Sequence, residues 1–146
     1  MRVLMICLGN ICRSPTAEAA LRRAAHDAGR SDVVVESRGT AGWHEGKGAD
    51  PRTVAHAKAR GLDLSGHRAR KLARADLVDF DVVYAMDEAN LEDVRQLCRG
   101  DDGLLGKVSL FLGDRGVPDP WSGGPADFER VLDLCEGRAL VLISGL

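Results

Sequence analysis

The chain has 146 residues, 45% of them hydrophobic and 29% charged, which is enough to bury one core and is ordinary for a soluble protein. A formal net charge of −2 argues against nucleic acid or an anionic membrane surface as a partner. No apolar run reaches the roughly 18 residues of a membrane span, and the apolar start is too short for a signal peptide.

The cysteines and histidines show none of the spacings that bind metals. The four cysteines contain no CxxC pair, and no two histidines stand at the i, i+4 spacing of a helical metal pair. A chain with a core of this size does not need disulfides, so we expect reduced thiols and a cytoplasmic location. We also expect no metal, no cofactor, one domain over residues 1–146 and a monomer.

Short apolar runs alternate with helical patterns along the chain. Runs with the length of a strand lie at 2–7, 33–36 and 81–86, with a weaker one at 107–112. Helical patterns lie at 15–28, 50–60, 88–98 and from 125 onward, where Gly137 weakens the pattern. This alternation predicts an α/β fold with a buried parallel sheet. The glycine-rich stretch 39–50 is predicted to be a surface loop, and loops of that length are often functional.

The first predicted strand ends at Cys7, and a loop over residues 8–13 follows it. Ser14 suits the N-cap of the next helix, and Pro15 suits its first position. The loop would then end on the free N–H groups of a helix N-terminus, which attract anions. Ligands of open α/β sheets also lie at the carboxyl ends of strands. The loop is therefore predicted to bind phosphate.

Residues inside this loop suit the same purpose. Gly9 and Asn10 are the residues best able to adopt a left-handed backbone, which would turn successive N–H groups inward as an anion nest. Such surroundings favour the thiolate of Cys7, which is its nucleophilic form. Arg13 offers a planar guanidinium that binds two phosphate oxygens at once. A buried cysteine beside a surface arginine is the alternative, but only Cys7 among the four cysteines has an arginine six residues later.

The run CLGNICRSP at residues 7–15 resembles the CxGNxCRSP loop of the low-molecular-weight protein tyrosine phosphatases. The resemblance continues through Ser37 with GTAGWHEG, LDLSGHRAR, DVVYAMDEANLEDV and VPDPW. It implies a four-stranded parallel sheet with helices on both faces, where the cysteine loop and the Asp-Pro loop converge. It also implies hydrolysis of phosphotyrosine on proteins, and of small aryl phosphates, through a phosphocysteine intermediate.

The resemblance assigns a role to each matching residue. Cys7 would attack phosphorus, Arg13 would hold the phosphate oxygens, and Ser14 would stabilise the sulfur. Asp119, set between two prolines, would protonate the leaving oxygen and later activate water; a turn-forming aspartate without that role is the alternative. The backbone of the loop would bind phosphate at Leu8, Gly9, Asn10, Ile11 and Cys12.

Further positions are assigned supporting roles. Ser37 and His67 match residues that hold Asn10 in its left-handed geometry. Trp43 and Trp121 lie in irregular segments and could sandwich the phenyl ring of phosphotyrosine, with ordinary loop packing as the alternative.

The remaining cysteines have other interpretations. Cys12 either is a small packing residue or forms a reversible disulfide with Cys7 that protects the nucleophile, and the sequence favours neither. Cys98 and Cys135 fall on the apolar faces of predicted helices and are expected in the core. Ser122 stands where some relatives have a second aromatic residue, so regulation by tyrosine phosphorylation is not expected at that position.

Three other functions share parts of this pattern. Protein-arginine phosphatases share the loop but have a threonine at the position of Ile11, whereas isoleucine offers an apolar wall suited to an aromatic substrate. Thioredoxin-coupled arsenate reductases need a further pair of cysteines, which Cys98 and the distant Cys135 do not supply. A non-enzymatic phosphate reader would need neither Cys7 nor Asp119. The expected partner is a tyrosine-phosphorylated protein, with a cognate tyrosine kinase as one candidate.

Overall fold

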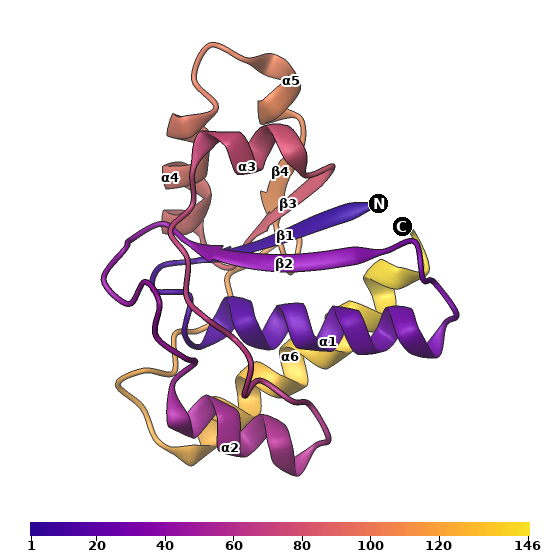
Figure 1. Cartoon of the computed structure of the whole chain (residues 1–146), viewed down its shortest axis with the longest axis vertical. Helices are drawn as coiled ribbons and strands as arrows, with labels where there is room; N and C mark the ends of the chain where they lie inside the picture. Colours follow the sequence, from indigo (N-terminus) through magenta and orange to yellow (C-terminus); the bar gives the residue numbers. More distant parts are fainter.

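A four-stranded parallel sheet forms the centre of the molecule in the computed structural model, which describes residues 1–146 (Figure 1). The strands run in the order β2-β1-β3-β4, and all three pairings are parallel. Their bounds are β1 Arg2–Cys7, β2 Val34–Gly39, β3 Val82–Ala85 and β4 Val108–Leu110. The predicted parallel sheet is therefore confirmed.

Helices cover both faces of this sheet (Figure 1). One face carries α1 (Arg13–Asp27) and α6 (Pro125–Ile143), which pack against each other, and α2 (Pro51–Ala59) packs on α6. The other face carries α3 (Arg74–Asp79), α4 (Glu88–Leu97) and α5 (Asp102–Leu105). None of these helices combines the length and apolarity that a membrane crossing requires.

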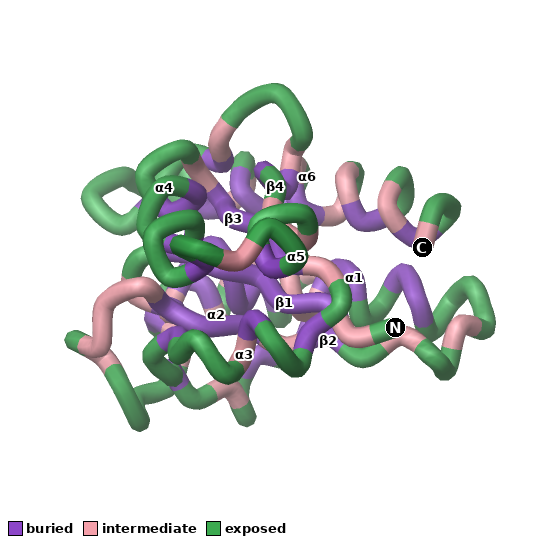
Figure 2. Tube along the Cα trace, turned by 90° about the horizontal axis from the view of Figure 1, so that it is seen from above, coloured by how far each residue is buried: buried purple, intermediate pink, exposed green.

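Strand β1 lies inside the sheet and supplies side chains to both cores. Successive side chains of a strand point to opposite faces, so Val3 and Met5 join the core under α1 and α6, while Leu4 and Ile6 join the core under α3 and α4. All four are completely buried, as the purple centre of Figure 2 shows. The same alternation directs Cys7 toward the α1 and α6 face.

The structure departs from the predicted elements in several places, and strand β2 extends to Gly39, three residues beyond the predicted run 33–36. The helices α3 and α5 were not predicted. Helix α6 continues through Gly137 to Ile143, because Ala139 and Ile143 are buried beyond it and their burial outweighs the roughly 1 kcal/mol that glycine costs in a helix. Helix α1 begins at Arg13, two residues before the predicted start.

Candidate active site

The loop over residues 8–12 joins β1 to α1 at the carboxyl edge of the sheet. The neighbours of β1 are β2 and β3, whose connections run in opposite directions along the sheet, and such a switch point is where open α/β sheets bind ligands. The N-cap of α1 is Cys12, so the predictions that Ser14 is the N-cap and Pro15 the first helical residue were wrong. Proline fits elsewhere in the first turn because N–H groups there have no helical acceptor.

Asn10 is the one non-glycine residue with a positive φ, at 57°. Its side-chain amide donates to Ser14 Oγ at 2.8 Å and to Ser37 Oγ at 2.9 Å. Its Oδ1 accepts from the Arg70 N–H at 3.0 Å, and its carbonyl oxygen contacts His67 Nε2 at 2.7 Å. Four contacts thus offset the cost of the left-handed backbone, which is of order 1–3 kcal/mol.

Gly9 does not share this geometry, so the prediction of a left-handed Gly9 was wrong. Glycine suits this position because it has no side chain, not because of its freedom to adopt a positive φ. A Cβ built on Gly9 would lie 3.0 Å from Cδ2 of His44, which covers this part of the loop. His44 itself was not singled out from the sequence.

The hydrogen bonds around Asn10 have a definite direction. Because Arg70 N–H is bonded to Oδ1, the NH2 group faces Ser14 and Ser37 and donates to both. Ser14 Oγ accepts that bond, so its own O–H is free to donate to Cys7 Sγ at 3.0 Å. The Asn10 N–H also donates to this sulfur at 3.3 Å. Two hydrogen-bond donors are therefore directed at the Cys7 sulfur.

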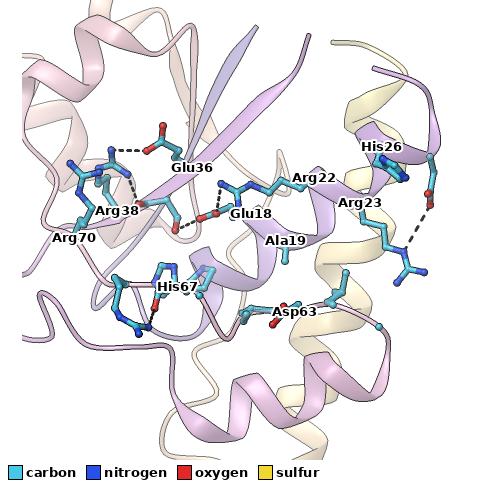
Figure 3. A pocket seen from close by; sticks show the side chains of 18 residues that line it. Glu18, Ala19, Arg22, Arg23, His26, Glu36, Arg38, Asp63, His67 and Arg70 are labelled. Atoms are coloured by element: carbon cyan, nitrogen blue, oxygen red, sulfur yellow. Dashed lines mark hydrogen bonds and ion pairs between the residues drawn. The ribbon is translucent and has the colours of Figure 1, made fainter. Parts of the chain in front are cut away.

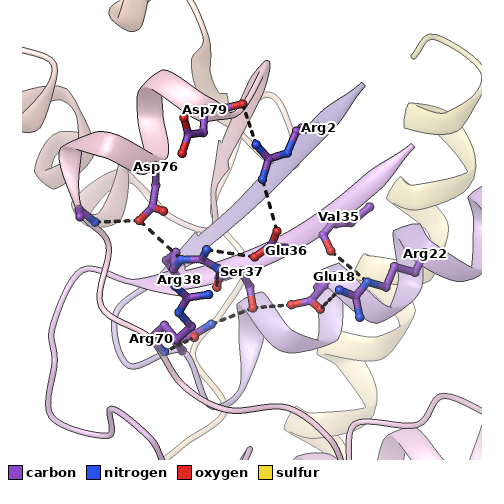
Figure 4. A network of polar contacts seen from close by, with 12 residues as sticks. Arg2, Glu18, Arg22, Val35, Glu36, Ser37, Arg38, Arg70, Asp76 and Asp79 are labelled. Carbon is purple, nitrogen blue, oxygen red and sulfur yellow. Dashed lines mark hydrogen bonds and ion pairs between the residues drawn. The ribbon is translucent and has the colours of Figure 1, made fainter. Parts of the chain in front are cut away.

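Glu18 forms the other end of this network and was missed in the sequence. The Ser37 hydroxyl donates to Glu18 Oε1 at 2.6 Å, which leaves the Ser37 oxygen free to accept from Asn10 (Figure 4). Arg22 holds the second Glu18 oxygen at 2.9 Å. The signal available in the sequence was the i, i+4 spacing from Ser14 to Glu18, which places both on one face of α1.

A polar cavity of about 750 Å³ lies behind the loop, between α1, the edge strand β2 and residues 61–70 (Figure 3). Arg22 Nε donates to the Val35 carbonyl and Arg38 Nη1 to the Ser37 carbonyl, at 2.9 and 2.8 Å. The two arginines therefore satisfy backbone groups that an edge strand would otherwise leave open to pairing with another chain.

Arg13, the first residue of α1, is almost completely buried. Its Nη1 donates to Asp87 Oδ2 at 2.6 Å and to the Val117 carbonyl at 3.1 Å. Burial lowers the pKa of Arg13, but the bond to Asp87 and the charges of Cys7 and Asp119 more than offset this, so the net effect raises the pKa. The guanidinium is thus held in place and always charged.

Asp87 was also missed in the sequence. It follows β3 directly and is the N-cap of α4, where its Oδ1 accepts from the Asn90 N–H at 2.8 Å. A carboxylate directly after a parallel strand lies at the same edge as the ligand-binding loops, and this was the signal that could have found it.

Asp119 lies in the segment between β4 and α6, and its side chain is half exposed. Its Oδ1 accepts from the Trp121 N–H at 3.1 Å, and its Oδ2 lies 3.6 Å from Arg13 Nη2. Because Oδ1 already accepts a hydrogen bond, Oδ2 is the oxygen available to carry a proton. The structure thus brings the carboxyl group beside the guanidinium that closes the loop.

The cysteine loop, Arg13 and Asp119 line one cavity of about 440 Å³. Trp43 and Trp121 line this cavity and are 70% and 59% exposed. The cavity is lined by Cys7, Leu8, Gly9, Ile11, Cys12, Arg13, Trp43, His44, Asp119 and Trp121. Ser14, Ser37 and His67 lie behind the loop and not in this cavity.

The other cysteines differ from Cys7 in their surroundings. Burial raises the pKa of Cys12 to about 12, so it is a neutral thiol at physiological pH although it lines the cavity. Cys98 and Cys135 are completely buried in the two cores, as predicted. Burial raises the pKa of both thiols.

Comparison with known proteins identifies the family. A family model described as "Low molecular weight phosphotyrosine protein phosphatase" matches residues 2–146. A low molecular weight protein-tyrosine-phosphatase of Streptomyces coelicolor is 40% identical, over 99% of this chain and 93% of that protein.

Two solved structures are similar throughout. A protein tyrosine phosphatase from Entamoeba histolytica, with Hepes in its active site, superposes with a TM-score of 0.93 at 32% identity, covering 99% and 95% of the two chains. Wzb from Vibrio vulnificus, in complex with benzylphosphonate, superposes with a TM-score of 0.88 at 28% identity, covering 99% and 98%. The chain is therefore a hydrolase of the low molecular weight phosphotyrosine protein phosphatase family.

Proposed function

We propose that the protein hydrolyses phosphotyrosine on proteins, and small aryl phosphates, through a phosphocysteine intermediate on Cys7. The observation that carries the proposal is the Cys7 sulfur, which accepts hydrogen bonds from Ser14 and Asn10 and lines the same cavity as Arg13 and Asp119. Nucleophile, cation and acid are thus available around one position for phosphorus.

The proposed reaction has two steps. The Cys7 thiolate attacks phosphorus while the bond to the phenolic oxygen breaks, and protonated Asp119 gives its proton to that oxygen. Water then attacks the phosphocysteine, with the Asp119 carboxylate accepting a proton from it, and the Cys7 thiolate leaves. Arg13 and the loop N–H groups hold the phosphate oxygens throughout, and the Ser14 hydroxyl stabilises the departing thiolate.

The walls of the cavity support an aromatic substrate. Ile11 contributes an apolar side chain, and Trp43 and Trp121 offer exposed rings on which a phenyl ring can pack. The related Wzb structure contains benzylphosphonate, which also joins a phenyl ring to a phosphorus oxyanion. A phosphoserine side chain has no ring to pack against the two tryptophan rings.

Hydrolysis of matched phosphopeptides tests this specificity. We expect turnover of a phosphotyrosine peptide and little or none of the phosphoserine and phosphoarginine peptides of the same sequence. The measurement is phosphate release at equal peptide concentration. A faster rate on phosphoarginine would contradict the proposal and favour a protein-arginine phosphatase.

Replacing Asp119 tests the acid. Asp119→Ala should lower kcat/KM on a phosphotyrosine peptide by roughly 10²–10⁴-fold, but much less on dinitrophenyl phosphate, whose leaving group needs no proton. Initial rates on the two substrates give the comparison. Equal losses on both would remove Asp119 from the role of acid.

The proposed partner is a tyrosine-phosphorylated protein, with a cognate tyrosine kinase as a candidate. The four buried, unpaired thiols support the reducing cytoplasm as its compartment.

A further inference from the structure

The acid loop, residues 118–124, carries Asp119 and is mostly exposed. Pro120 is its one buried residue. Before the loop, the Val117 N–H donates to the Met86 carbonyl at 2.6 Å; at its end, the Gly124 N–H donates to Asp127 at 2.8 Å. A segment this exposed needs additional contacts to keep one geometry.

Arg52, the second residue of α2, supplies such a contact. Its Nη2 donates to the Trp121 carbonyl at 2.9 Å. The same guanidinium stacks over the ring of Phe128 in α6, with 4.6 Å between its central carbon and the ring centroid. The arginine therefore joins the middle of the acid loop to two helices that pack on each other.

Asp50 holds this arginine and also contacts the cysteine loop. Its carboxylate accepts from Arg52 Nε at 3.2 Å and from Nη2 at 2.9 Å. Its own N–H donates to the Ile11 carbonyl at 2.9 Å. Asp50 is also the N-cap of α2 and is 8% exposed, so its position is well defined. The start of α2 thus links the loop that carries Cys7 with the loop that carries Asp119.

The contact of Arg52 extends to the catalytic carboxyl through one peptide. Arg52 holds the Trp121 carbonyl, and the Trp121 N–H donates to Asp119 Oδ1 at 3.1 Å. This second bond leaves Oδ2 as the oxygen that can carry a proton. Displacement of Trp121 would therefore move both the acid and one aromatic wall of the cavity.

We propose that Arg52 is a positioning residue that sets Asp119 and Trp121 relative to Cys7 by holding the acid loop. The inference rests on the proposed function, in which Asp119 is the acid. An arginine suits the task because its planar fork contacts Asp50 and the Trp121 carbonyl together and still stacks on Phe128. A lysine could make one of these bonds but not the whole set.

The test uses the full chain and two esters that differ in their need for a proton, phenyl phosphate and dinitrophenyl phosphate. Arg52→Ala should lower kcat/KM on phenyl phosphate by roughly 10–100-fold, as expected for a misplaced catalytic group, with a much smaller loss on dinitrophenyl phosphate. Arg52→Lys should recover part of the loss. The melting temperature of each variant checks that it is folded.

Arg23→Ala is the matched control. Arg23 is also about half exposed, donates to a backbone carbonyl, that of Arg60, at 2.9 Å, and lies 4.0 Å from a carboxylate, that of Asp27. It contacts neither loop, so its replacement should leave the ratio of the two rates at the wild-type value.

Two outcomes would overturn the inference. The role of Arg52 would be refuted if Arg52→Ala lowered both rates equally or lowered neither, while Asp119→Ala still lowered the phenyl phosphate rate more than the dinitrophenyl phosphate rate. The proposed function would then still stand. If Asp119→Ala itself shows equal losses, the acid assignment fails, and the inference fails with it.

Discussion

Cys7→Ser should abolish turnover of aryl phosphates, by at least roughly 10⁴-fold, while the variant still binds phosphate-like oxyanions. A serine hydroxyl does not ionise near neutral pH, so the same two hydrogen bonds cannot make it a nucleophile. Arg13 and the loop N–H groups remain to bind the anion. Phosphate release gives the turnover, and calorimetric titration with vanadate gives the binding.

Two results would contradict this assignment. Substantial turnover by Cys7→Ser would show that another group attacks phosphorus. Binding of phosphate by the wild-type protein without any hydrolysis between pH 5 and 7 would instead support a non-enzymatic phosphate reader. Cys98→Ser is a control, because Cys98 is buried in the opposite core and its replacement should affect stability but not turnover.

Arg13→Lys should also lower kcat/KM strongly, by roughly 10²–10³-fold. The guanidinium bonds to Asp87 and the Val117 carbonyl through Nη1 and presents Nη2 beside Asp119. A lysine offers one ammonium group, which would pair with Asp87 and leave the phosphate oxygens with fewer donors. Initial rates on a phosphotyrosine peptide measure the loss.

Arg38→Lys separates this effect from a general loss of stability. Arg38 is equally buried and also contacts a carboxylate, Glu36, and a backbone carbonyl, that of Ser37, but it does not line the cavity with Cys7. We expect a lower melting temperature and a kcat/KM within a few-fold of wild type. If both variants lost activity equally, the phosphate-binding role of Arg13 would be refuted.

The sheet could be predicted because its two central strands, β1 and β3, are continuous apolar runs buried on both faces. The short helices could not. In α3, Leu77 is the one buried residue among six, and α5 spans four residues, so neither contains a repeating apolar pattern. Helix α6 could be predicted only in part, because the contacts that carry it past Gly137 come from the sheet and α1.

The residues of the site, too, could be predicted only in part. The cysteine loop is contiguous, so its residues could be found together in the sequence. Asp87 and Arg52 act through contacts with residues 74 and 69 positions away, and no local pattern reveals such pairs. The N-cap position of Ser14 and the left-handed backbone of Gly9 were wrongly predicted because cap and turn preferences describe isolated segments. Here the Ser14 hydroxyl bonds to Cys7 and Asn10, and His44 covers Gly9.

Trapping the covalent intermediate tests most directly whether Cys7 is the nucleophile. A phosphotyrosine peptide would be mixed with the protein, the reaction quenched within its first turnover, and the digested chain analysed by mass spectrometry. We expect a phosphoryl group on Cys7 of the wild-type protein; in Asp119→Asn the same group should accumulate with dinitrophenyl phosphate, whose leaving group needs no proton, because attack of water on the intermediate is then slow. Turnover without phosphorylated Cys7 at any quench time, or a phosphoryl group on another residue, would contradict this role of Cys7.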